Sequence, residues 1–297
     1  MDDEIGNFVV VFRPPGNAPM YKIEVNNSQY TFVAAAAALA TKVLQTPQAI
    51  DAMIELALEL AETCPNVGFH VGIVWHGELE DFNPREHMIH INSQRLEDLM
   101  AAADAGTLMA DRHFQTFVFQ LANTFVHEVG GHLLMTFLSD LIVDENGQMA
   151  RPFTPPSVTY SNYGTRDNCV AGESGRALED ILFGESLEYY HDPNGGPRQP
   201  GISHLLDEDN LVRCIPEAFI GNFLANQFEF PYPVEGPAIA PRTMVPLGNT
   251  ITPIQFPHPS ARPQFALQDL PDMTGDRVLI KRLRQALTDR TLHAIAV

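Results

Sequence analysis

Two histidines and a glutamate lie close together in the segment NTFVHEVGGHLLMTF, which runs from Asn123 to Phe137. Imidazole nitrogens are frequent ligands of Zn²⁺, and a glutamate beside such a ligand can take a proton from an attacking water. His127 and His132 are five positions apart in the sequence. A regular α-helix therefore turns the second side chain about 140° away from the first. Both can meet one metal ion only if the helix takes up an extra residue.

A π-helical turn supplies such an extra residue, and these insertions are often found at functional sites. Gly130 and Gly131 stand where the insertion would be needed. Two glycines destabilise a regular helix interior by about 1 kcal/mol each relative to alanine, but they let the backbone deform. The sequence therefore predicts a one-residue bulge that turns His132 back beside His127. The alternative is a chance match in a chain with 11 histidines.

A catalytic zinc ion needs a third protein ligand, and two histidines with a carboxylate are one standard set. The segment GESGRALEDILFGESLEYY supplies carboxylates on a predicted helix. Helical spacing puts Glu173 and Asp180 on one face and turns Glu179 elsewhere. We predict Glu173 as the third ligand, Glu179 as its alternative and Asp180 as a hydrogen-bond partner of one histidine. Arg176 would orient Glu173 or Asp180, although an amphipathic helix with solvated acids is the simpler interpretation.

The segments HEVGGH and GESGRALED together resemble the two motifs of gluzincin zinc metallopeptidases. The dipeptidyl peptidase III family in particular has H-E-x-x-G-H as its first motif and E-E-x-R-A-E as its second. The resemblance covers only Val126–Glu185, in a chain much shorter than those enzymes. It implies His127 and His132 as zinc ligands, Glu128 as the general base and an acid of the second helix as the third ligand. The chain departs from the family at Ser174, where the family has its ligand acid.

A hydrolytic centre also needs a hydrogen-bond donor for the developing oxyanion. Tyr163 lies in a Gly/Asn-rich stretch shortly before the predicted ligand helix, and His191 directly follows that helix. We predict these two side chains as catalytic candidates. Tyr160, Tyr189 and Tyr190 are alternatives, and packing or surface exposure is the competing interpretation for each.

The composition excludes some partners. Acidic residues outnumber basic ones 37 to 18, for a formal charge of −19. Nucleic acids and anionic membranes need Lys/Arg surfaces, so neither is the expected partner. The three cysteines (Cys64, Cys169 and Cys214) show no C-x-x-C spacing. Sparse thiols and an acidic start without a signal-like charge pattern predict a cytoplasmic protein.

The hydrophobic pattern predicts an α+β fold. Strands are expected within 8–25 and 67–77, and the stretch EHMIHIN before the metal helix is a candidate substrate-binding edge strand. Helices are expected at 30–64 with a break at Pro47, at 111–143 and at 171–190. We predict one zincin-like domain in three parts: an α/β half at 1–110, a helical half with the metal site at 111–230, and a Pro-rich wrap with a C-terminal helix at 231–297.

These features favour a zinc-dependent hydrolase of metallopeptidase type that attacks a peptide or another amide or ester carbonyl. The alternative is a zinc enzyme of another type, a hydrolase, lyase or cyclase, acting on a small metabolite. A third hypothesis is a binding scaffold without catalysis, in which Glu128 has no measurable role.

Overall fold

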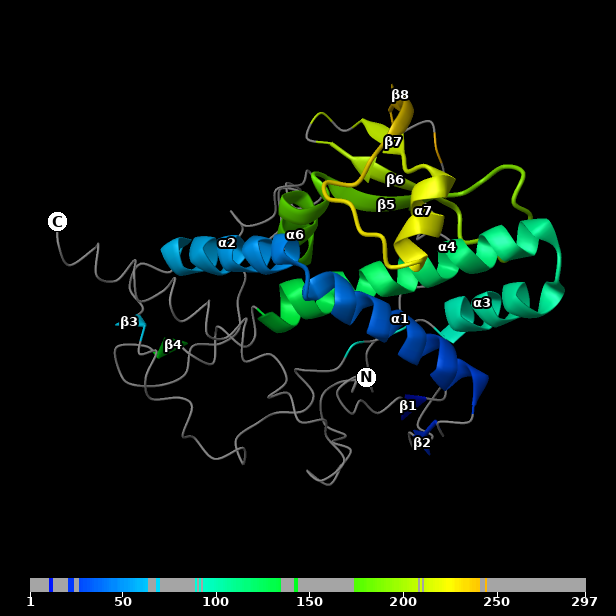
Figure 1. Cartoon of the computed structure of the whole chain (residues 1–297), viewed down its shortest axis with the longest axis horizontal. Helices are drawn as coiled ribbons and strands as arrows, with labels where there is room; N and C mark the ends of the chain where they lie inside the picture. Colours follow the sequence, from blue (N-terminus) through cyan, green and yellow to red (C-terminus); the bar gives the residue numbers. More distant parts are fainter. Residues whose placement is uncertain are drawn as a thin grey trace.

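The computed structural model describes residues 11–12, 21–23, 27–63, 68–69, 89, 91, 93–134, 142–143, 174–207, 209, 211–240 and 244. Within these ranges the chain combines helices with small antiparallel sheets, an α+β arrangement in agreement with the prediction (Figure 1). The predicted C-terminal helix and most of EHMIHIN lie outside the described residues. The finer zincin-like arrangement and the division into three parts stay predictions.

The helices of the described residues are α1 (Ser28–Leu44), α2 (Pro47–Thr63), α3 (Ser93–Ala105), α4 (Leu108–Phe125), the π-helix (Val126–Leu133), α6 (Ser174–Phe183) and α7 (Glu217–Leu224). Helix α4 is in contact with α1, α3, α7 and the π-helix. Both α1 and α3 pack against α4, while α6 packs against α2 and the π-helix (Figure 1). Pro47 begins α2 as predicted, because proline fits the first helical turn. The Thr107 hydroxyl caps α4 by accepting a hydrogen bond from the Ala110 N–H at 3.1 Å.

One four-stranded antiparallel sheet lies beside these helices, in the order β5-β6-β7-β8. Its strands are β5 (Ser186–Tyr190), β6 (Ile202–Leu206), β7 (Val212–Cys214) and β8 (Glu235–Ile239). Two short ribbons pair β1 (Val11–Phe12) with β2 (Tyr21–Lys22), and β3 (Gly68–Phe69) with β4 (Ile142–Val143).

Two helix predictions were too long. The helix expected up to residue 190 ends at Phe183, and Gly184 follows with a left-handed φ of +91°. The next residues form β5, whose Leu187 pairs with Leu205 of β6 and faces the core. The helix expected up to residue 143 is also wrong at its end, because Ile142 belongs to β4. Apolar runs of this length suit a buried strand as well as a helix, and pairing with a second strand decides between them.

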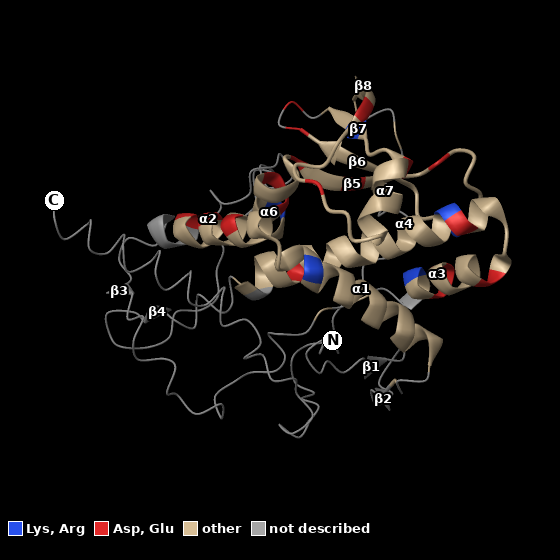
Figure 2. Ribbon diagram, in the orientation of Figure 1, with Lys and Arg blue, Asp and Glu red and all other residues tan. Residues whose placement is uncertain are grey.

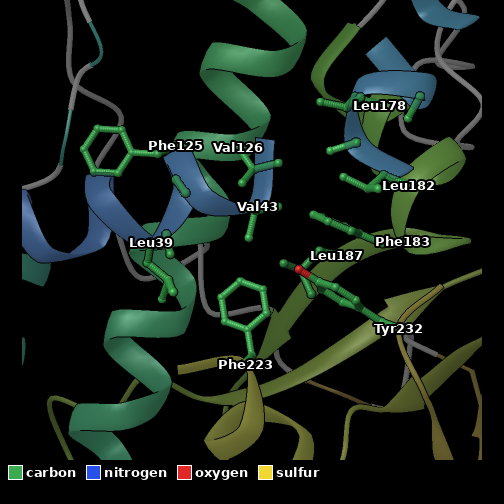
Figure 3. Close-up of a cluster of buried hydrophobic side chains, with 14 of the residues drawn as sticks. Leu39, Val43, Phe125, Val126, Leu178, Leu182, Phe183, Leu187, Phe223 and Tyr232 are labelled. Atoms are coloured by element: carbon green, nitrogen blue, oxygen red, sulfur yellow. The ribbon is translucent and has the colours of Figure 1, made fainter. Parts of the chain in front are cut away.

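The main core fills the space between α1, α4, α6, α7 and the sheet (Figure 3). Phe119, Phe183 and Phe223 are completely buried there. Tyr232 stacks on Phe183 with ring centroids 4.1 Å apart, and its hydroxyl donates to Asn123 Oδ1 at 2.7 Å. This core fixes α4 and α6, the two elements that flank the candidate site.

Acidic residues recur along α2 (Figure 2). Asp51 and Glu55, for example, are exposed on α2. Among the described residues, none of the helices has the length and apolar character needed to cross a membrane.

Candidate metal centre

The segment that carries both histidines is π-helical. The helix continues from α4 without a break, and Val126–Leu133 has the π pattern. The Leu134 N–H, for example, donates to the carbonyl of Val129, five residues earlier. The predicted insertion is therefore confirmed. The imidazole centroids of His127 and His132 lie 5.2 Å apart, with 58° between the ring planes, so the two side chains share one side of the helix.

Three side chains of this turn form a cluster with suitable geometry for a metal ion. The ligand atoms of His127, Glu128 and His132 all lie within 4.8 Å of one another, and each residue is half-buried. The two imidazole nitrogens match ligands that Zn²⁺ takes in catalytic sites, and the carboxylate of Glu128 lies beside them, where a general base is needed. The chemistry of this donor set fits zinc, although the same set also serves other divalent transition metals.

Two glycines let α6 lie directly against the π-helix. A Cβ atom on Gly131 would overlap the backbone of Gly175, and a Cβ on Gly175 would overlap the imidazole ring of His127. The backbones therefore cross at these two positions, and the ring of His127 lies over Gly175. Gly131 was expected to allow the helix to deform; the structure shows that it also allows this close crossing.

His127 is oriented by a carboxylate of α6. Its Nδ1 lies 2.8 Å from Oε1 of Glu179, whose side chain is 6% exposed. Because a carboxylate accepts, Nδ1 carries the proton and Nε2 keeps the lone pair for a metal. The prediction that Glu179 points elsewhere is wrong. Gly175 and Glu179 are four residues apart and share the face of α6 that meets His127.

The second histidine has a weaker neighbour on the same helix. Ser174 is completely buried, and its Oγ lies 3.4 Å from Nδ1 of His132. This distance is at the long limit of a hydrogen bond. Here α6 contributes a hydroxyl to His132 and a carboxylate to His127.

Glu179 is itself held at its other oxygen. Oε2 accepts from the backbone N–H of Leu187 at 3.0 Å and from Arg176 Nη1 at 3.1 Å. Arg176 was expected to orient Glu173 or Asp180, and the acid it contacts on α6 is Glu179. A buried carboxylate with its oxygens bonded in this way has a fixed position, which fixes the imidazole it contacts.

The remaining predicted residues are placed as follows. Glu173, Tyr163 and Tyr160 lie outside the described residues. His191 is exposed in the loop after β5, where its Nε2 lies 3.1 Å from Nε2 of Gln199. It is not a member of the His127–Glu128–His132 cluster. Its catalytic role stays a prediction, as does that of Tyr163.

Tyr189 and Tyr190 occupy opposite faces of β5. Tyr190 is buried with its ring edge-on to His204, at a centroid distance of 5.2 Å. Tyr189 packs against the main core. Burial first, and the negative charge of Glu179 second, raise the pKa of the Tyr189 phenol well above its ordinary value. At neutral pH this phenol therefore keeps its proton and does not act as a base.

Three contributors to the site were missed or given other roles from the sequence: Ser174, Gly175 and Glu179. The i, i+4 spacing of Gly175 and Glu179 is a usable signal, because a small residue and an acid on one helix face allow an imidazole to lie between them. Only the crossing of two helices reveals which face is used. The chain matches no protein-family model, no curated protein and no solved structure.

Proposed function

We propose that the chain is a zinc-dependent hydrolase of metallopeptidase type, with His127, His132 and Glu173 as metal ligands. The observation that carries this proposal is the π-helical cluster of His127, Glu128 and His132. Glu179 of α6 contacts the Nδ1 atom of His127 in this cluster. Orienting carboxylates of this kind are typical of metal-ligating histidines. The resemblance of HEVGGH and GESGRALED to gluzincin motifs supports the same assignment and a zincin-like arrangement of the helical half.

A bound zinc ion would polarise a carbonyl group and activate a water molecule as nucleophile. Glu128, adjacent to both histidines, would take the proton of that water and pass it to the leaving group. Glu179 would keep His127 in the tautomer that ligates through Nε2. Tyr163 and His191 are the proposed donors to the oxyanion.

The proposed substrate is a peptide or another amide or ester. The acidic charge of the chain argues against nucleic acid and anionic membrane. We also propose a cytoplasmic location, which is supported by the sparse cysteines of the sequence.

The metal centre is tested by the zinc content of the purified protein and of two variants, His132→Ala and Glu173→Ala. We expect stoichiometric zinc in the wild type and its loss in both variants. A wild type without zinc, or variants that keep it in full, would contradict the ligand set. Gly221→Ala serves as the control variant, because a Cβ there meets no atom within 4 Å.

The reaction is tested with Glu128→Gln. We expect this variant to keep its zinc and to cleave a mixed peptide substrate about 10²–10⁴-fold more slowly than the wild type. Mass spectrometry of the products measures both rates. Cleavage at the wild-type rate would exclude Glu128 as the general base. If the zinc-loaded wild type leaves all peptides intact, the peptidase assignment fails.

A further inference from the structure

A chain of contacts connects His127 to strand β5. The imidazole contacts Glu179, and Glu179 contacts Arg176. The same guanidinium then reaches β5, where its Nη2 lies 3.1 Å from Oε1 of Glu188. A row of four contacting side chains thus runs from the metal cluster to the edge strand of the sheet. Their polar groups are, in order, an imidazole, a carboxylate, a guanidinium and a carboxylate.

The backbone of β5 takes part in the same network. The Leu187 N–H donates to Glu179 Oε2 at 3.0 Å, and its carbonyl accepts from Arg176 Nη1 at 2.6 Å. Both backbone polar groups of Leu187 are therefore bonded to side chains of α6. A strand at the edge of a sheet usually offers such groups to solvent or to another strand.

These charged groups are largely removed from water. The side chains of Glu179, Arg176 and Glu188 are 6%, 17% and 14% exposed. Burial of charges is costly unless each one is paired with good geometry, and removal of one partner leaves the others uncompensated. Arg176 lies between two acids, so the loss of either acid changes how it is held. The position of Glu179 therefore depends on a residue of the sheet that is not part of the His127–Glu128–His132 cluster.

We infer that β5 is a part of the metal centre, and that Glu188 is a positioning residue for metal binding. The inference rests on the proposed metal function. Glu188 holds Arg176, Arg176 and Leu187 hold Glu179, and Glu179 fixes the tautomer and ring orientation of His127. Glu188 itself neither ligates the metal nor contacts the substrate.

The chain offers a matched control on the same part of the sheet. Glu185 immediately precedes β5, and its Oε1 forms an ion pair with Arg213 Nη2 at 2.5 Å. Its side chain is 17% exposed, close to the value for Glu188, but its partner lies on β7 and not on α6. Truncation of Glu185 removes a comparable ion pair of the sheet without altering the Arg176 network.

The test is the zinc dissociation constant of the full chain, measured by competition with a chromophoric chelator. We expect Glu188→Ala to weaken binding about tenfold, at the lower end of the 10–100-fold range for groups that orient ligands. Glu188→Gln keeps the size of the side chain but removes the charge that pairs with Arg176, so we expect it to bind zinc more weakly than the wild type. Glu185→Ala should bind zinc as the wild type does.

A spectroscopic measurement separates positioning from a general loss of structure. With Co²⁺ in place of zinc, the visible absorption bands report the ligand geometry, and we expect them to change in Glu188→Ala but not in Glu185→Ala. If Glu188→Ala and Glu185→Ala had equal zinc affinities and equal Co²⁺ spectra, the inference about Glu188 would be overturned, and the proposed metal centre would be unaffected. Absence of metal binding by the wild type would overturn the proposed metal centre and the inference with it.

Discussion

At the scale of single residues, His127 is constrained on two sides. Its ring lies over Gly175, and its Nδ1 contacts Glu179. The first contact depends on the absence of a side chain, and the second on a carboxylate that is itself fixed. If His127 ligates a metal as proposed, these constraints would hold its ring in one orientation before the metal binds and so lower the entropic cost of binding.

Gly175→Ala tests the first constraint. A Cβ atom at this position would overlap the imidazole of His127, so the ring must move and the cluster is disrupted. We expect zinc affinity to fall at least as much as on loss of an orienting group, about 10–100-fold. The measurement is the chelator competition described above. Gly221→Ala is the control in α7, and its affinity should equal that of the wild type. Unchanged zinc affinity of Gly175→Ala would contradict the observed crossing.

A second prediction concerns the titration of Glu188. Burial raises the pKa of its carboxyl group above the ordinary value of 4.5, against the attraction of Arg176, and the charge of Glu179 raises it further. Between 4.5 and the raised pKa, the folded protein therefore holds a proton that the unfolded chain releases. The free energy of unfolding must fall as pH rises through this window.

Denaturant unfolding of the metal-free protein measures this effect, with Glu188→Gln as reference. We expect the unfolding free energy of the wild type, relative to the variant, to be larger at about pH 4 than at about pH 7, since the ordinary pKa of glutamate lies near the lower limit. A difference that grows with pH would show that the pKa of Glu188 is lowered and not raised.

At the scale of elements, the π-helix is the feature that allows two histidines five positions apart to face the same metal ion. Five positions separate His127 from His132, and the wider turn brings both rings to one side. Removal of one residue from this turn should therefore leave a regular α-helix with the two histidines at i and i+4, which also share a face.

Deletion of Gly130 tests this account of the π-helix. The variant reads H-E-V-G-H, and we expect it to bind zinc within about tenfold of the wild type, because i and i+4 side chains meet one metal ion. Insertion of an alanine after Gly131 should abolish binding, since the second histidine then turns away. Zinc binding is measured for both variants, with circular dichroism to confirm folding. Loss in the deletion variant together with retention in the insertion variant would contradict the account.

The sequence was sufficient to predict the helices that have clear boundary residues, and to predict the π-helical turn. Pro47 marks the start of α2, and the histidine spacing together with Gly130–Gly131 indicated the insertion. The role of Glu179 could not be obtained in this way, because it depends on where α6 crosses the π-helix. That crossing is set by Gly131 and Gly175, which are far apart in the sequence. Strand β5 was missed since its apolar run also suits a helix, and its pairing partner comes later in the chain.

At the scale of the whole molecule, the site joins parts of the chain that are distant in sequence. The π-helix extends α4, α6 provides the residues behind the histidines, and β5 holds α6 in place. The main core reaches all three (Figure 3). Metal bound at this junction should stabilise the folded protein as a unit, because the unfolded chain lacks the site.

Thermal unfolding tests this coupling. Zinc at 100 times its dissociation constant should add about 2.7 kcal/mol to the free energy of unfolding, if the unfolded chain has no affinity. We expect a chelator to lower the melting temperature of the wild type and to leave that of His132→Ala unchanged. Calorimetry of both proteins with and without chelator measures the effect. If the chelator lowered the melting temperatures of both proteins equally, the metal would be bound at a site that does not include His132.

X-ray absorption at the zinc edge of the loaded wild-type protein tests the central claim most directly, because it counts the imidazole ligands. We predict two imidazoles, from His127 and His132, and one carboxylate, from Glu173, at about 2.0–2.2 Å. His132→Ala should show one imidazole or no bound zinc. A spectrum of the wild type with fewer than two imidazoles, or a protein that takes up no zinc, would contradict the claim that the π-helix forms a metal centre.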